Sequence, residues 1–288
     1  MKSNKLKKWL AAPYAVWAAG FIIIPLILIL YYAFTGEEGG FTLSNFAYVA
    51  TKENIKALGL ALWLSLLSTA LCLLLAYPLA MILANRNVNQ TSFIVLIFIL
   101  PMWMNFLLRT YSWMAILENN GLLNQLFRKI GLIALYNNIF GTDISFFRMI
   151  NTQGAVVLGM VYNYLPFMIL PIYSVIVKLD HSLIEAARDL GANSVQVFRR
   201  VILPLSLPGV LSGITMVFVP SVSTFAISKM LGGGTEMLLG DLIEQQYMGG
   251  AYNPYLGAAI SLVMMVIVVI CMVVMNRFGE GEEQAVMM

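Results

Sequence analysis

Charged residues are scarce in this chain. Only 11% of its 288 residues are Asp, Glu, Lys or Arg, whereas 60% are hydrophobic. A soluble domain of ordinary composition carries about 25% charged residues. The scarcity argues against a typical soluble globular protein and predicts a protein of the lipid bilayer. The small net charge of +3 gives no indication of a nucleic-acid partner.

The residues that metal sites, disulfides and many catalytic centres require are also rare. His181 is the single histidine, and the two cysteines, Cys72 and Cys271, both lie in apolar runs. We therefore predict no metal site, and we expect the cysteines to be small buried hydrophobic residues without a disulfide. A serine hydrolase within the membrane is disfavoured, because the spans offer no histidine base.

A nucleotide-binding loop is missing as well. The glycine-rich stretch from Gly232 to Thr235 is not followed by the Gly-Lys-Ser/Thr that cradles phosphates. We expect a tightly turned loop there, no cofactor in this chain and no catalytic residues. ATP and magnesium, if the protein depends on them, must be bound by another subunit.

Long apolar runs dominate what is present. Crossing the hydrocarbon core takes about 20 apolar residues, and about six runs meet that length. They are Trp9–Phe34, Ala57–Ala84, Ser92–Ile116, Gly154–Val177, Leu205–Ser228 and Pro254–Asn276. The first is too long for the apolar region of a cleavable signal peptide, so we expect it to remain as an anchor. The fold class predicted is an all-α, polytopic membrane protein with about six transmembrane helices.

Basic residues indicate the orientation of these spans. Four lysines lie within residues 1–8, and the positive-inside rule places this segment in the cytoplasm. With six spans, both termini and the segment 179–204 are then cytoplasmic. The long loops 36–56, 117–153 and 230–253 face outward. In the second of these, Gly121–Phe127 is expected to form an amphipathic helix in the membrane interface.

A charged, helix-forming island separates the fourth and fifth predicted spans. Ser182 followed by Glu185 matches a capping box, and Asp180 is a competing N-cap. Gly191 supplies a left-handed helix end. A second short helix is expected from Asn193. The pattern predicts a helix–turn–helix that projects into the cytoplasm, although a solvated interfacial loop would have a similar composition.

The island carries a recognisable motif. It consists of Glu185, Ala186, Ala187, Gly191, Leu203 and Pro204. This pattern resembles the cytoplasmic signature of binding-protein-dependent ABC importer permeases, whose loop inserts into a groove of the ATP-hydrolysing subunit. The resemblance implies an ATPase-coupling role for Glu185, Ala186, Ala187, Arg188, Asp189, Gly191, Leu203 and Pro204.

Further segments of the sequence indicate which group of these permeases the chain resembles most. They are Arg109–Trp113, Gly121–Asn124, Leu165–Pro171, Phe198–Val201, Leu231–Gly233 and Leu256–Ala259. They are similar to segments of the spermidine/putrescine importer permeases, and the likeness runs through nearly the whole chain. It implies one permease domain over residues 1–288 with the type I ABC importer permease fold, in the bacterial inner membrane.

The resemblance also implies partners. An external polyamine-binding protein would deliver the substrate, and two ATP-binding cassette subunits would supply the energy. One coupling loop cannot engage two ATPases symmetrically, so a second, homologous permease subunit is expected. The chain itself would catalyse no reaction.

A polyamine passage calls for carboxylates and aromatic faces, because both attract ammonium groups. The candidates for this path are Trp103, Tyr111, Trp113, Glu118, Tyr162, Asn163, Tyr164, Thr224, Glu236, Asp241 and Glu244. Aromatic residues at span ends equally form the ordinary interfacial belt, and loop acids are usually solvated. Arg109 lies within a predicted span, where it either anchors the helix, by snorkelling or by pairing with Glu118, or contacts the substrate.

Two other transporter classes remain to be compared. A permease of the same superfamily for an amino acid, sulfate or iron would share the coupling loop. An ion-coupled secondary transporter is less favoured, since buried acids and internal repeats are not evident in the sequence.

Overall fold

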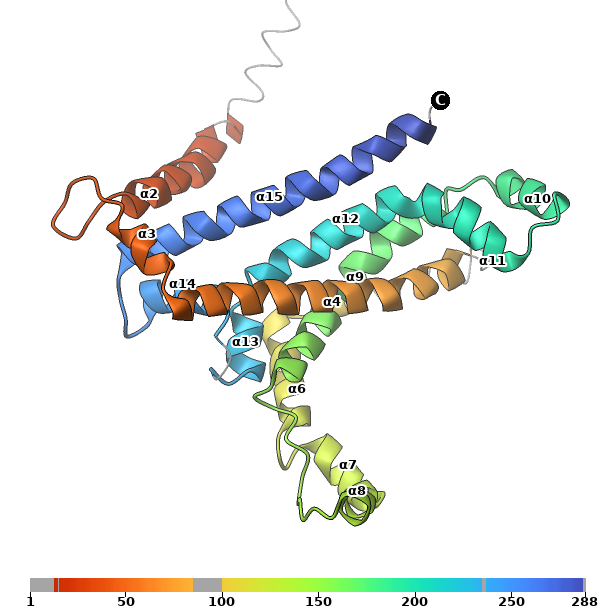
Figure 1. Cartoon of the computed structure of the whole chain (residues 1–288), viewed down its shortest axis with the longest axis horizontal. Coiled ribbons are helices and arrows are strands. Elements are labelled where there is room, and N and C mark those ends of the chain that lie inside the picture. Colours follow the sequence, from red (N-terminus) through yellow and green to blue (C-terminus); the bar gives the residue numbers. More distant parts are fainter. Residues whose placement is uncertain (1–12, 15, 85–99, 235–236, 287–288) are drawn as a thin grey trace, which may run out of the picture. The chain divides into compact units, whose positions relative to one another are not determined.

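The computed structural model describes residues 13–14, 16–84, 100–234 and 237–286. Nearly all regular structure in these residues is helical, and the elements follow one another along the chain as labelled in Figure 1. Their bounds are η1 Ala19–Ile23, α2 Ile24–Ala33, α3 Ser44–Val49, α4 Lys52–Ala84, α6 Phe106–Leu117, α7 Leu122–Lys129, α8 Leu132–Phe140, α9 Gln153–Ile176, α10 His181–Asp189, α11 Ser194–Val197, η2 Phe198–Ile202, α12 Leu203–Val222, α13 Ala226–Leu231, α14 Leu239–Met248 and α15 Pro254–Val286. The predicted all-α class is confirmed.

Five helices of the described residues are long and apolar enough to cross a membrane. They are Val16–Ala33, Lys52–Ala84, Gln153–Ile176, Ser194–Val222 and Pro254–Met275. They correspond to five of the six predicted spans. The remaining one, Ser92–Ile116, begins on residues outside the described part, so a count of six stays a prediction, as does the side on which the termini lie.

The described part of that remaining span is not one continuous helix. The backbone leaves the helical conformation at Asn105, whose side-chain carbonyl accepts hydrogen bonds from the N–H groups of Leu107 and Leu108 at 2.9 and 3.3 Å. Asn105 is thus the N-cap of α6. The expectation of an uninterrupted helix to Ile116 is wrong, because an asparagine inside an apolar run starts a new helix.

The fifth span also ends earlier than predicted. α12 stops at Val222 instead of continuing to Ser228, and the short helix α13 follows after a break of three residues. Pro220 has no backbone N–H and removes a donor from the last turn of α12, and the helix ends two residues later.

Contacts divide the chain into two compact units, each described by itself. Unit 1 comprises Met1–Lys56 and Leu242–Ile267, and unit 2 comprises Ala57–Asp241 and Val268–Met288. The expectation of a single permease domain over residues 1–288 stays a prediction.

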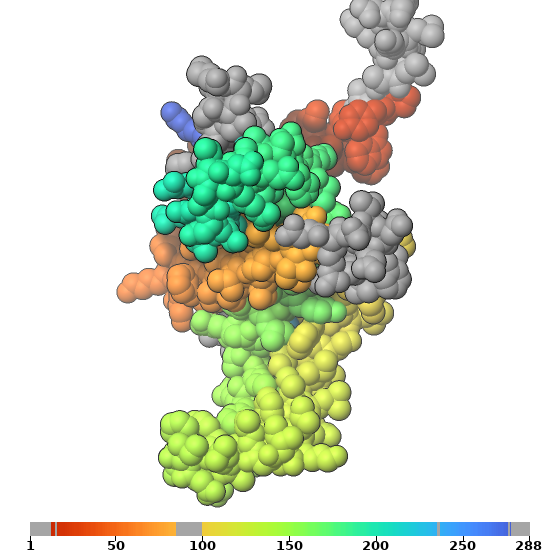
Figure 2. Space-filling model, turned by 90° about the vertical axis from the view of Figure 1, so that its right-hand side faces the viewer, coloured from red at the N-terminus to blue at the C-terminus, as the bar shows by residue number. Residues whose placement is uncertain are grey.

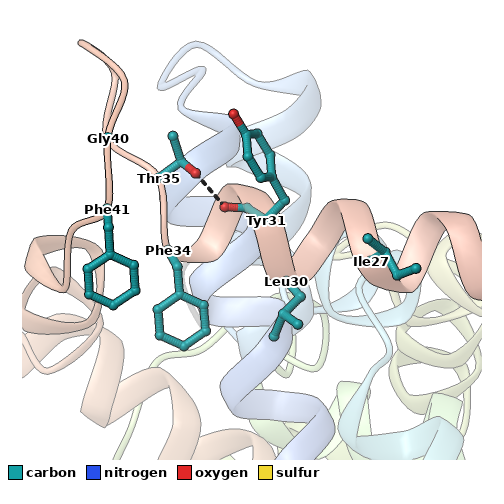
Figure 3. Close-up of a pocket in the computed structure, with 7 residues that line it drawn as sticks. All are labelled: Ile27, Leu30, Tyr31, Phe34, Thr35, Gly40 and Phe41. Atoms are coloured by element: carbon teal, nitrogen blue, oxygen red, sulfur yellow. Dashed lines mark hydrogen bonds between the residues drawn. The ribbon is translucent and has the colours of Figure 1, made fainter.

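Unit 1 packs the end of α2 against the start of α15. Ala33 is buried against Ala258 and Ala259, where small side chains allow close approach. The rings of Tyr32 and Tyr255 meet edge to face at 5.5 Å. Beside α2, an apolar hollow is lined by Ile27, Leu30, Tyr31, Phe34, Thr35, Gly40 and Phe41 (Figure 3). A lipid-facing helix end of this composition is what a bilayer protein requires.

Unit 2 is built around α4, α9 and α12. Its core contains Cys72 and Ala76 of α4, Met168 and Ile172 of α9, and Val217 of α12. Cys72 is buried, as predicted, whereas Cys271 on α15 is only partly buried.

Glycine brings two of these helices together. A Cβ atom at Gly209 of α12 would lie 2.8 Å from the carbonyl oxygen of Pro171 on α9, and one at Gly213 would lie 2.6 Å from the sulfur of Met168. Small residues at such positions let two membrane helices pack with their backbones nearly in contact. The α9–α12 pair is therefore the rigid centre from which the candidate site extends.

Candidate functional site

Helix α10 begins at a side-chain cap. The Asp180 carboxylate accepts a hydrogen bond from the Ser182 N–H at 2.9 Å. This backbone hydrogen bond holds the pKa of Asp180 below its usual value of 3.8. Of the two N-caps that the sequence allowed, the structure selects Asp180. The Ser182–Glu185 capping box is wrong, because Ser182 already lies inside the helix and Asp180 occupies the capping position.

The end of α10 confirms the predicted role of Gly191. Its φ angle is +83°, in the left-handed region that glycine adopts without strain. The Gly191 N–H bonds to the Arg188 carbonyl at 2.8 Å, and the Ala192 N–H bonds to the Ala187 carbonyl at 3.1 Å. These two bonds constitute a Schellman motif.

Four residues separate helix α11 from the end of α10. Helix α11 starts directly after the predicted Asn193 and begins with a reciprocal cap. The side chain of Asn193 accepts from the Gln196 N–H, and the side chain of Gln196 accepts from the Asn193 N–H, each at 2.9 Å. The predicted helix–turn–helix is therefore confirmed at both helices.

The outer surface of this helix–turn–helix is uncovered. Glu185, Ala186, Arg188, Asp189 and Gly191 are exposed, as the sequence led us to expect of a docking element. Apolar side chains are exposed beside them: Leu190 is 89% exposed and Val195 is 71% exposed. Exposed apolar groups bordered by charges are typical of a protein interaction surface.

The inner side of the same element is fixed to the spans. The Phe198 ring lies edge to face on Tyr77 of α4, with centroids 5.6 Å apart. The Tyr77 and Ser206 hydroxyls are 2.6 Å apart, and Ser206 Oγ in turn donates to the Leu203 carbonyl at 3.0 Å. Because Ser206 donates to Leu203, the Tyr77 hydroxyl donates to Ser206 Oγ. These contacts connect the turn after α11 to both α4 and α12.

Leu203 and Pro204 mark the entry into α12. The π-helical turn η2 ends with the Leu203 N–H bonded to the Phe198 carbonyl. Pro204, which has no N–H, occupies the first turn of α12, where no donor is required of it. Leu203 packs against the core of unit 2 and Pro204 is exposed. These two residues join the projecting element to the span.

Sequence reasoning did not assign the Tyr77–Ser206 contact. The two residues are 129 positions apart. The sequence contains one indication of this contact: a tyrosine and a serine lie near the same ends of two apolar spans. That indication does not identify the two residues as a pair.

Some candidates for the substrate path come together around α9. Trp113 of α6 contacts Tyr162 with ring centroids 5.4 Å apart. The Tyr164 hydroxyl donates to the Pro220 carbonyl of α12 at 3.4 Å. Asn163, only 1% exposed, donates to the Gly159 carbonyl at 2.9 Å, and its side-chain oxygen has no partner among the described residues.

These three consecutive residues do not line one wall. Successive positions of an α-helix are rotated by about 100°. Tyr162 accordingly contacts α6 and Tyr164 contacts α12, while Asn163 is buried. Of these candidates, only Tyr162 and Trp113 contact each other.

The remaining candidates lie elsewhere. Trp103, Tyr111 and Glu118 are exposed, Thr224 is buried between α12 and α13, and Glu236 lies outside the described residues. Asp241 is buried and accepts from Ser228 Oγ and from the Leu238 N–H, both at 2.9 Å. Glu244 is half-buried one turn further along α14. Asp241 therefore stabilises the α13–α14 connection.

Arg109 is buried, with 7% of its surface exposed. Its Nε and Nη1 atoms have no hydrogen-bond partner among the described residues, and no ion pair joins it to Glu118 there. Among the described residues the helix turns Arg109 inward without an ion pair to Glu118, and its role as an anchor or a substrate contact stays a prediction. A buried guanidinium with two unpartnered nitrogens is costly, so Arg109 is a candidate functional residue.

Known transport proteins resemble this chain over most of its length. A family model described as "Binding-protein-dependent transport system inner membrane component" matches residues 76–280. A protein of Haemophilus influenzae named spermidine/putrescine transport system permease protein PotB is 35% identical over 96% of this chain and 96% of its own length. The Escherichia coli protein of the same name is 33% identical, over 91% of this chain and 93% of its own.

Solved structures support the fold. A bacterial ABC transporter involved in alginate import has a chain with a TM-score of 0.75 and 17% identity, covering 97% of this chain and 96% of that one. A chain of the MetNI methionine ABC transporter has a TM-score of 0.54 and 20% identity, covering 79% and 95%. At these identities the likeness concerns the fold alone.

Proposed function

The chain belongs to the family of inner membrane components of binding-protein-dependent transport systems, and on this premise we propose that it is the permease subunit of an ATP-driven importer of spermidine and putrescine. The observation that carries the mechanism is the exposed α10–α11 element, tied to α4 and α12 through Phe198, Tyr77 and Ser206. The substrate assignment is supported by the printed names of the relatives, which match most of the chain.

The chain transmits movement and catalyses no covalent reaction. Two ATP-binding cassette subunits bind ATP and magnesium, and the surface of Glu185, Ala186, Arg188 and Asp189 docks in a groove of one of them. When the ATPases close, they displace α10 and α11. The Phe198 ring passes this movement to Tyr77, and the spans alternate between outward and inward access. A second, homologous permease engages the other ATPase, and an external binding protein delivers the polyamine.

The polyamine passes weak, aromatic contacts. The Trp113–Tyr162 pair presents ring faces to an ammonium group, with about 0.5–1 kcal/mol gained per exposed contact. The unpartnered oxygen of Asn163 accepts one ammonium N–H. A conduit has to release what it binds, so several weak contacts serve transport better than one buried carboxylate. The exposed residues Trp103 and Tyr111 belong to the same path, and the acids Glu118, Glu236 and Glu244 attract the cation to it. Tyr164 and Asp241 are engaged in contacts of the neighbouring helices and Thr224 is buried, so these three support the path without lining it.

A second candidate is suggested by Arg109. Its buried, unpartnered guanidinium would repel a polyamine and would bind an anionic solute. An importer of an amino acid or sulfate with the same coupling element is therefore the competing function.

Uptake by the reconstituted transporter distinguishes the two. With the ATPases, the second permease and the binding protein present, labelled spermidine should enter vesicles in a saturable, ATP-dependent manner, and excess amino acid or sulfate should not compete. Uptake of labelled sulfate or amino acid instead, abolished by Arg109→Gln, would replace the polyamine assignment with the anionic one.

The coupling role has its own test. Glu185→Lys should abolish ATP-driven uptake while the subunit remains in the membrane, because the reversed charge disrupts docking of the ATPase. Glu38→Lys is the matched control, since Glu38 is also an exposed acid but lies in the loop after α2. Normal uptake by Glu185→Lys would refute the proposed docking surface.

A further inference from the structure

Two short helices after α6 expose their apolar side chains. The helices α7 and α8 with their connections, residues 118–150, are called here the α7–α8 hairpin. On α7, the residues Leu122 and Leu126 are 67% and 50% exposed, and Ile130 follows them on the same side. These positions are four residues apart, so they form one stripe along the helix. On α8, Leu135 and Ile139 form a second stripe.

Two asparagines of the hairpin hold its loops in place. Asn124 of α7 is fully buried, donates to the carbonyls of Glu118 and Phe147, and accepts from the Phe147 N–H at 2.9 Å. Asn137 of α8 donates to the Ile144 carbonyl at 3.0 Å and accepts from its N–H at 3.1 Å. These amides are used inside the hairpin, whereas leucine and isoleucine side chains stay uncovered on its surface.

The hairpin holds these stripes in a fixed arrangement. Phe147 contacts the rings of Phe127 on α7 and Tyr136 on α8, edge to face, at 5.9 and 5.2 Å. Arg128 Nε donates to the Ser145 carbonyl at 2.9 Å. Figure 2 shows the hairpin, in yellow-green, projecting away from α10 and α11 within unit 2. The exposed stripes thus belong to a defined structure.

The surrounding charges indicate which medium covers the stripes. The hairpin contains three cations, Arg128, Lys129 and Arg148, and two anions, Glu118 and Asp143, so its net charge is +1. Lys129 and Arg148 are exposed beside the apolar residues. Apolar stripes bordered by cations are the pattern of helices that lie in the interface of a membrane containing anionic lipids.

We propose that the α7–α8 hairpin is a membrane-surface anchor. Leu122, Leu126, Leu135 and Ile139 insert among the acyl chains, and Lys129 and Arg148 contact the phosphates of anionic phospholipids. Only four residues separate α7 from the end of α6, the last part of the third predicted span, so the hairpin is within reach of the lipid surface. The anchor would hold α6, and with it Trp113, at a fixed depth. This role does not depend on which solute is transported.

Accessibility of spin labels tests the anchor in the complete transporter. Single cysteines are placed at Leu126 or Ile139 in a chain carrying Cys72→Ala and Cys271→Ala, and the labelled complex is put in nanodiscs with phosphatidylglycerol. Asp143, an exposed acid in the segment after α8 and outside both stripes, is the control. Collisions with oxygen should exceed those with a water-soluble nickel chelate several-fold at Leu126 and Ile139, and the order should reverse at Asp143.

Two results would overturn the proposal. High nickel accessibility at Leu126 and Ile139 would place the hairpin in water. Low accessibility to both reagents would show a protein cover, either the second permease or the binding protein. The lipid-phosphate contact is tested by Lys129→Glu with Arg148→Glu, which should lower oxygen accessibility at Leu126 in anionic nanodiscs and less so in phosphatidylcholine alone. Equal loss in both lipids would refute that contact.

Discussion

Replacing Gly191 by valine should destabilise the end of α10 and weaken coupling. Gly191 adopts a φ of +83°, and an added Cβ atom would meet nothing within 4 Å. The cost is therefore conformational and not a steric clash with neighbouring residues. A non-glycine residue in the left-handed region loses about 1–2 kcal/mol, and a β-branched side chain is among the least tolerant.

The loss can be measured by hydrogen exchange. A penalty of 1–2 kcal/mol changes the ratio of open to closed forms by about 5–30-fold. The N–H groups of Gly191 and Ala192 close the Schellman motif. The Ala192 N–H and the last turn of α10 should therefore exchange faster by that factor in Gly191→Val, and ATP-driven uptake should fall.

Two further variants test whether the effect arises from the backbone conformation of Gly191 or from the loss of a glycine as such. Gly191→Asn should have a smaller effect, because asparagine tolerates the left-handed region. Gly250→Ala should have almost none, since Gly250 has no positive φ and open space around it. Unchanged exchange in Gly191→Val would refute the argument that glycine is required here for its backbone conformation.

Three further outcomes are expected. Tyr77→Phe should lower the thermal stability of the detergent-solubilised subunit by about 0.5–1.5 kcal/mol, because Ser206 loses its donor; an unchanged melting curve would contradict the link. Gly209→Ala should separate α12 from α9 and cost about 1–3 kcal/mol by overpacking, whereas Gly59→Ala, in open space on α4, should not; equal melting temperatures would argue against close packing. The Asp180 carboxyl group has a lowered pKa in the folded protein. Its contribution to the stability of α10 is therefore fully present above the unfolded pKa of 3.8, and it is lost as the pH falls through the lower folded pKa. Exchange of α10, corrected for its intrinsic rate, should rise in that range in the wild type and not in Asp180→Asn.

Much of the architecture could be predicted, because local rules decide it. Apolar runs of membrane-crossing length indicated the spans. Gly191 indicated the end of α10, and Asn193 indicated the start of α11. These signals act within a few residues of one another. Where two local signals competed, as at Asp180 and Ser182, the sequence left both open.

The errors arose where helix ends depend on single residues or on neighbours. Asn105 starts a new helix within a run that reads as one span, and α12 ends after Pro220. The direction of Arg109 was left open by the sequence. It depends on how α6 packs against α9 and α13, which no spacing in the sequence reveals.

The sequence by itself indicated the medium and the class of this protein, and it predicted the α10–α11 helix–turn–helix. The scarcity of charge requires a bilayer, and the Glu185 motif with its glycine stop indicates a coupling helix. The tertiary structure alone decided which distant residues meet. It paired Tyr77 with Ser206 and Trp113 with Tyr162, buried Arg109, and turned the leucines of α7 outward. Helix periodicity specifies that a helix has faces, but only packing against other helices determines what each face contacts.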